Sequence, residues 1–106
     1  MKLVRFQARG EVVDAASGRG LSGLVVRAYD KDLIRDDRLG KTTTDEQGRF
    51  LISFNEDDFR DLFELSPDLY LRILDPATGE VLHQTEVRSD IEADEHFRIE
   101  LDRTPA

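Results

Sequence analysis

The chain has 106 residues, a length that suits one domain with a single core. Hydrophobic residues make up 39%, charged residues 36%, and the absence of Cys excludes disulfides and thiolate metal sites. The net charge of −8 disfavours nucleic acid, anionic membranes and other acidic partners, and it allows cations or basic protein surfaces. Arg5 and Arg9 interrupt the N-terminal apolar residues, so we expect no signal peptide, and no apolar run reaches membrane-spanning length. The sequence does not indicate the cellular compartment of the protein.

Seven segments have the pattern of β-strands. In residues 3–13, Val4, Phe6 and Ala8 alternate with polar residues, as in a half-buried strand. Residues 49–54 place Phe50 and Ile52 on one face in the same way. Turn sequences rich in Gly, Asp and Pro separate the segments. The expected strands are 3–13, 24–30, 40–44, 49–54, 68–74, 80–86 and 96–101.

The spacing of apolar residues changes from that of a strand to that of a helix between the fourth and fifth expected strands. Asn55 can cap a helix, and three acidic residues follow it, where the helix dipole favours negative charge. Phe59, Leu62 and Phe63 are then spaced i, i+3, i+4, which predicts a short amphipathic helix over 55–65. The chain is therefore predicted to be all-β, a seven-stranded Greek-key sandwich with one short helix, covering 1–102 and followed by a tail at 103–106.

A longer pattern links these strands. It reads L-x-G-L-x-V-x-A-Y-D-x-D at 21–32, D-D-x-L-G at 36–40 and T-D-x-x-G-R-F-x-I-S at 44–53. This pattern resembles the transthyretin-like and carboxypeptidase-regulatory-like β-sandwich modules, and most closely those of bacterial toxin-complex-like and secretion-associated proteins. The resemblance implies a prealbumin-like sandwich. It also implies a non-catalytic module for protein–protein interaction or domain spacing within a larger secreted or toxin-like assembly.

One group of enzymes, the hydroxyisourate hydrolases, resembles the same fold. Those enzymes carry an early histidine, a central arginine, a second histidine and a C-terminal Y-R-G-S. Here no histidine precedes His83, the chain ends in LDRTPA, and no G-x-S-x-G motif occurs. His83 and His96 also lack metal-ligand spacing. We therefore predict that the chain is not an enzyme, with hydrolase activity of this type as a less favoured alternative.

A calcium site is the main alternative function. If strand directions alternate, the loops 31–39 and 87–95 and the helix 55–65 share one end of the sandwich. Acidic residues of these loops would then converge, and Ca²⁺ takes about six to eight oxygen ligands. The candidate ligands are Asp30, Asp32, Asp36 and Asp37, with Asp90, Glu92 and Asp94 nearby. The run also resembles the third calcium loop of synaptotagmin-type domains. The competing interpretation is a solvated loop, and no cofactor other than Ca²⁺ is expected.

An interaction surface is also predicted. Tyr29, Tyr70 and Leu74 occupy outward positions on their strands, and aromatic residues concentrate at protein interfaces. They would form a docking patch for a protein partner, or else be covered by a second sheet or a neighbouring domain. The sequence leaves the partner and the oligomeric state open.

Overall fold

The computed structural model describes residues 5–32, 35–55 and 67–102, and all seven expected strands are present there. No helix occurs within these ranges; apart from Asn55, which ends a strand, the expected helix over 55–65 lies outside the described residues, as does the tail at 103–106. The strands are β1 (Arg5–Asp14), β2 (Val25–Asp30), β3 (Asp37–Thr43), β4 (Arg49–Asn55), β5 (Leu69–Leu74), β6 (Val81–Gln84) and β7 (Asp94–Leu101).

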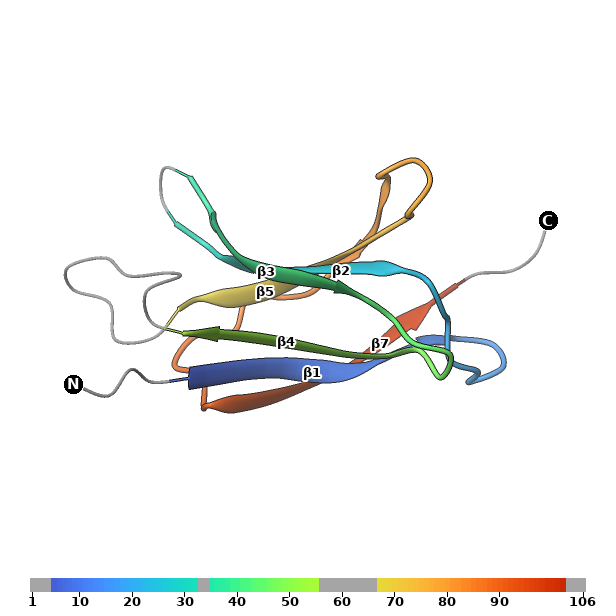
Figure 1. Ribbon diagram of the computed structural model, residues 1–106, viewed down its shortest axis with the longest axis horizontal. Helices are drawn as coiled ribbons and strands as arrows, with labels where there is room; N and C mark the ends of the chain where they lie inside the picture. The colour runs from blue at the N-terminus through green and yellow to red at the C-terminus, as the bar shows by residue number, and fades with distance from the viewer. Residues whose placement is uncertain (1–4, 33–34, 56–66, 103–106) are drawn as a thin grey trace.

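The strands form two stacked sheets, as Figure 1 shows. The three-stranded sheet has the order β4-β1-β7, in which β1 is antiparallel to β4 and parallel to β7. The four-stranded sheet has the order β3-β2-β5-β6 and is antiparallel throughout. Strands β3 and β4 meet at the sandwich edge, and β5 returns beside β2. This order confirms the Greek-key prediction.

The core lies between the sheets and is built from the alternating positions that the sequence indicates. On β4, Phe50, Ile52 and Phe54 are buried, and Phe54 stacks on Phe6 of β1 with ring centroids 5.5 Å apart. The four-stranded sheet contributes apolar residues from β2 and β5 to the same cluster. Burying an apolar side chain of this size stabilises the fold by about 1.5–3 kcal/mol relative to leaving it exposed. The alternating apolar positions therefore determine which face of each strand packs against the core.

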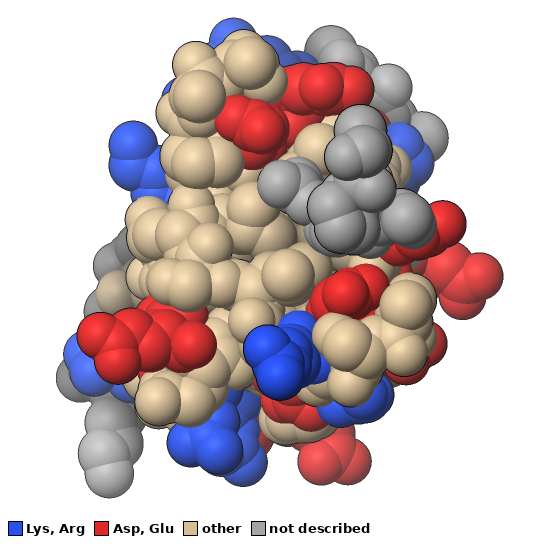
Figure 2. Space-filling view, turned by 90° about the vertical axis from the view of Figure 1, so that its right-hand side faces the viewer, with Lys and Arg blue, Asp and Glu red and all other residues tan. Residues whose placement is uncertain are grey.

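Three turns at one end of the sandwich share a local design, in which an aspartate carboxylate accepts the backbone N–H two residues further on. The donors and acceptors are Ala16 and Asp14 at 3.1 Å, Gln47 and Asp45 at 2.9 Å, and Ala77 and Asp75 at 2.8 Å. Each turn then reaches a glycine with positive φ, where a side chain would be strained. Figure 2 shows this end, with acidic and basic groups interspersed around a mainly uncharged centre.

Residues 31–32, 35–36 and 85–93 lie at the opposite end of the sandwich (Figure 1). For the described parts of these two loops, the strand directions that the calcium prediction assumed are therefore confirmed. Figure 1 shows the outer face of the four-stranded sheet between the start of β3 at one end and the hairpin of β5 and β6 at the other. Within the described ranges, no helix has the length and apolar character that a membrane span requires.

Candidate functional site

Asp30, the first candidate calcium ligand, is a buried structural residue. Its side chain is 1% exposed, and its Oδ1 accepts a hydrogen bond of 2.8 Å from the backbone N–H of Asp68. This bond ties the end of β2 to the residue before β5. A buried carboxylate without hydrogen-bond partners would destabilise the fold, and this bond satisfies that of Asp30. We therefore assign Asp30 a structural role.

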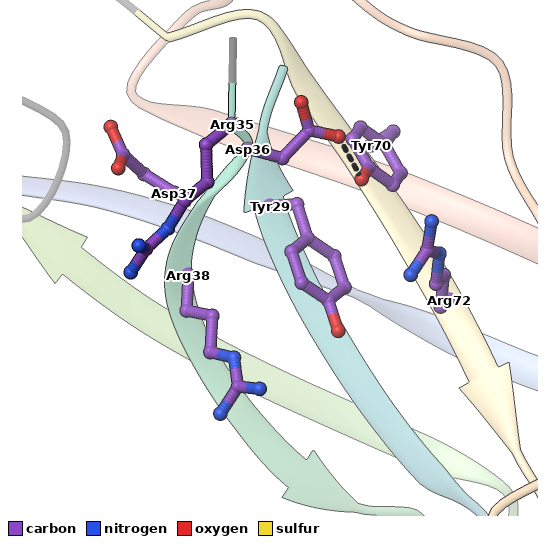
Figure 3. A pocket seen from close by; sticks show the side chains of 7 residues that line it. All are labelled: Tyr29, Arg35, Asp36, Asp37, Arg38, Tyr70 and Arg72. Atoms are coloured by element: carbon purple, nitrogen blue, oxygen red, sulfur yellow. Dashed lines mark hydrogen bonds between the residues drawn. The ribbon is translucent and has the colours of Figure 1, made fainter. Parts of the chain in front are cut away.

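The other three candidate ligands do not converge on one point. Asp36 accepts one hydrogen bond from the backbone N–H of Asp32 at 3.0 Å and another from the hydroxyl of Tyr70. Asp37 is exposed on β3, and Figure 3 shows its side chain directed away from that of Asp36. The carboxylates of Asp36 and Asp37 therefore point in different directions, although the residues are adjacent in sequence.

The acidic residues of the second loop are also engaged elsewhere. Asp94 forms an ion pair of 2.9 Å with Arg9 on the outer face of the three-stranded sheet. The backbone N–H of Glu92 donates to the carboxylate of Glu95 at 2.8 Å, and Asp90 has a positive φ of 53°. Across residues 5–32, 35–55 and 67–102, no three acidic or histidine side chains gather in a way that could hold a metal ion. Calcium binding stays a prediction that this geometry does not support.

The two tyrosines of the predicted docking patch form a stack. Tyr29 of β2 and Tyr70 of β5 lie opposite each other, with ring centroids 5.2 Å apart and an interplanar angle of 14°. Their side chains are nonetheless only 7% and 1% exposed, and Leu74 is 6% exposed. Neighbouring side chains of the same chain, rather than a second sheet, contact the rings. The predicted residues therefore offer little surface of their own.

Arg72 covers the tyrosine stack. Its guanidinium carbon lies 5.0 Å from the ring centroid of Tyr29 and 5.6 Å from that of Tyr70, within the range of a cation–π interaction. The Nε–H of Arg72 donates to Oε1 of Gln84 on β6 at 2.9 Å. The guanidinium is thus held beside the rings by contacts from three strands, β2, β5 and β6; Figure 3 shows Arg72 next to the two rings.

The hydrogen bond between Tyr70 and Asp36 joins this stack to the loop before β3. The hydroxyl of Tyr70, and then the N–H of Asp32, lower the pKa of Asp36 below its ordinary value. Burial, and then the bond to Asp36, raise the pKa of Tyr70 to about 12. At neutral pH a neutral hydroxyl therefore donates to an ionised carboxylate, which is the stronger kind of hydrogen bond.

Cationic residues surround the stack. Two neighbouring depressions share Tyr29 and Arg38 in their lining. The first is also lined by Arg35 and Arg72 together with the acidic Asp36 and Asp37, whereas the charged residues that line the second, Arg27, Arg38 and Lys41, are all cationic. This cationic group was not predicted from the sequence, because the net charge of −8 conceals it and its members are far apart in the chain. The outward positions on β2, β3 and β5 could have indicated it, once the pairing of these strands was known.

The two histidines belong to different sheets. His83 lies on β6 of the four-stranded sheet, and His96 lies on β7 of the three-stranded sheet. Nε2 of His96 is 3.1 Å from a carboxylate oxygen of Glu11 on the neighbouring strand. The structure therefore does not bring the two histidines together in one site.

Comparison with known proteins adds information on the fold. No family profile matches the sequence, and no curated protein sequence matches it. The structure is similar to part of a 9R-lipoxygenase from Cyanothece PCC8801, with a TM-score of 0.70 and 22% identity, covering 91% of this chain and 16% of that one. It is also similar to a DUF3823 family protein from Bacteroides uniformis ATCC 8492, with a TM-score of 0.57 and 17% identity, covering 91% of this chain and 42% of that one.

These likenesses establish the β-sandwich architecture alone, because identity is low in both cases. The chain spans less than half the length of either structure. Neither comparison identifies a transthyretin-like family, so that resemblance stays a prediction from the sequence.

Proposed function

We propose that this chain is a non-catalytic β-sandwich module that binds a protein partner or a neighbouring domain through the outer face of its four-stranded sheet. The observation that carries the proposal is Arg72, whose guanidinium lies over the buried stack of Tyr29 and Tyr70. Arginine is enriched among the residues that contribute most to binding at protein interfaces. Side chains already fixed before binding lose less entropy when a partner docks, so this stack is a suitable rigid centre for an interface.

The surroundings of the stack support the same role. The adjoining cations line open depressions beside the rings, so they would contribute a polar rim around a rigid centre. The similar folds also form only 16% and 42% of longer chains, which suits a domain that spaces or docks other domains. From the sequence resemblance, we place the partner within a larger secreted or toxin-like assembly.

Site-specific photocrosslinking tests this proposal. A photoreactive amino acid replaces Lys41 on the four-stranded face, and in a control chain it replaces Leu51, which is 52% exposed on the three-stranded face. In cells that produce the chain, we expect a discrete crosslinked species from position 41 and none from position 51. The species would then be reconstituted from purified components. Crosslinks from position 51 alone would overturn the choice of face.

A further inference from the structure

We propose that the partner presents an extended acidic peptide segment to the four-stranded face, where its carboxylates bind a row of three cations. This inference rests on the function proposed above and names the chemistry of the partner. The row consists of Lys41, Arg27 and Arg72, from three neighbouring strands. Arg27 is paired in register with Lys41 on one side and with Arg72 on the other. Directly opposite residues project from the same face, and adjacent strands are about 4.8 Å apart, so the three positions span about 10 Å.

This row is unfavourable for the isolated sheet. Like charges directly opposite each other on neighbouring strands destabilise the pair. Within the described residues, Arg27, Arg38 and Lys41 form no ion pair, although the whole chain carries a charge of −8. The ion pairs of the described residues lie on the three-stranded face and in the loop before β7. An acidic ligand would relieve the repulsion, so the face is complementary to negative charge.

Arg72 is prepared for carboxylate recognition. The tyrosine rings and Gln84 fix its plane and occupy its Nε–H. The described residues accept no hydrogen bond from its terminal nitrogens, which remain available as donors. A planar guanidinium with free donors can bind a carboxylate through two parallel bonds. The order imposed by the stack reduces the entropy lost when such a bond forms.

The spacing of the cations favours a peptide over a small anion. A phosphate or sulfate offers one centre of negative charge, whereas an extended peptide can place separate carboxylates along a row of about 10 Å. In an extended peptide, side chains on one face repeat every 6.8 Å or so, and two acidic residues can therefore reach neighbouring cations with their long side chains. The net charge of −8 opposes a dense polyanion such as nucleic acid more strongly than a short peptide.

Fluorescence anisotropy with a defined probe tests the inference. The probe is a fluorescein-labelled peptide in which Glu and Val alternate, and the same peptide with Lys in place of Glu is the control probe. The full chain is expected to bind the Glu peptide saturably. The double variant R27Q/K41Q should weaken binding by about tenfold or more. The matched variant R5Q/R49Q removes the same charge from the three-stranded face and should change affinity by less than about twofold.

Other outcomes overturn the inference. These are absence of saturable binding, equal loss in both double variants, or equal affinity for the Lys peptide. Binding of single-stranded DNA at similar affinity, lost in R27Q/K41Q, would assign the face to nucleic acid. Self-association in sedimentation experiments that R27Q/K41Q removes would assign it to a second copy. A partner crosslinked at position 41 that contains no acidic segment would refute this inference and leave the proposed function intact.

Discussion

The two outer faces of the sandwich differ in how their charged residues are paired. On the three-stranded face, residues of opposite sign pair across the strands: Arg9 lies 2.9 Å from Asp94, and Glu11 lies 3.5 Å from Arg98. Glu11 also lies 3.1 Å from Nε2 of His96. On the four-stranded face, cations lie opposite cations, and order comes from stacking on tyrosine. This difference in charge pairing is the reason for our proposal that the four-stranded face, and not the three-stranded face, binds a partner.

The largest effect should come from the backbone beneath the three-stranded face. Strand β1 is bonded on both sides, and a Cβ on Gly10 would lie 1.7 Å from the carbonyl oxygen of Phe97. We expect Gly10→Ala to lower the free energy of unfolding by about 3 kcal/mol or more, measured by urea denaturation. In the control, Gly79→Ala, the φ of +75° strains alanine but no atom lies within 4 Å, so the cost is about 1 kcal/mol. Equal losses would contradict the close approach of β1 and β7.

On the four-stranded face, Tyr70→Phe should lower the free energy of unfolding by about 1 kcal/mol, because it removes the hydrogen bond to Asp36. The raised pKa of Tyr70, about 12, means that its contribution is complete below the ordinary pKa of 10.0 and is lost as the pH rises through about 12. The lowered pKa of Asp36 means that its contribution is present above 3.8 and is lost as the pH falls below that value.

Absorbance at alkaline pH measures this directly. The wild-type chain should show a tyrosine component that ionises near pH 12, and Tyr70→Phe should lack it. The control variant Tyr29→Phe should retain it. If the component near pH 12 were lost only from the Tyr29→Phe variant, the raised pKa would belong to Tyr29 and not to Tyr70, and the prediction would be wrong.

The charge contrast between the faces predicts effects of opposite sign. Glu11→Gln removes the ion-pair partner of Arg98 and the carboxylate beside His96, and it should lower the free energy of unfolding by about 0.5 kcal/mol. Lys41→Gln relieves repulsion with Arg27 and should raise it by a few tenths, or about 0.3 kcal/mol. Both changes should shrink at high salt, which screens exposed charges. Effects of the same sign in urea denaturation would remove the distinction between the faces.

Calcium should have the smallest effect. Because the described aspartates do not gather, we expect a melting-temperature shift below about 1 °C at millimolar Ca²⁺ relative to chelator. Differential scanning fluorimetry measures the shift, with Mg²⁺ as the comparison ion. A larger shift that Asp36→Asn removes would restore the calcium prediction.

The fold was largely predictable because alternation along each strand records which face is buried. Phe50, Ile52 and Phe54 show this directly, and turn residues mark the strand ends. The helix over 55–65 stays a prediction. The start of β3 at Asp37 instead of residue 40 was missed, because the irregular pairing near Tyr29 extends the hairpin through charged residues that have no strand pattern.

The candidate site was less predictable because its chemistry depends on pairing between distant strands. The sequence predicted Tyr29 and Tyr70 as interaction residues, and their part in binding stays a prediction. It could not indicate that Arg72 lies over both rings, because that position follows from the β2–β5 register. Likewise, nothing in a run of aspartates distinguishes buried Asp30 from exposed Asp37 until the path of the loop is known. Local sequence sets the face of a residue, whereas register sets its neighbours.

The parallel pairing of β1 with β7 also has a mechanical consequence. Figure 1 shows the described chain entering β1 at one end of the sandwich and leaving β7 at the other. A stretching force applied between these points would act parallel to both strands, along the paired region that runs from Gln7–Asp94 to Asp14–Leu101. This force would load all the hydrogen bonds between β1 and β7 together and not break them one after another. The module would therefore resist mechanical extension.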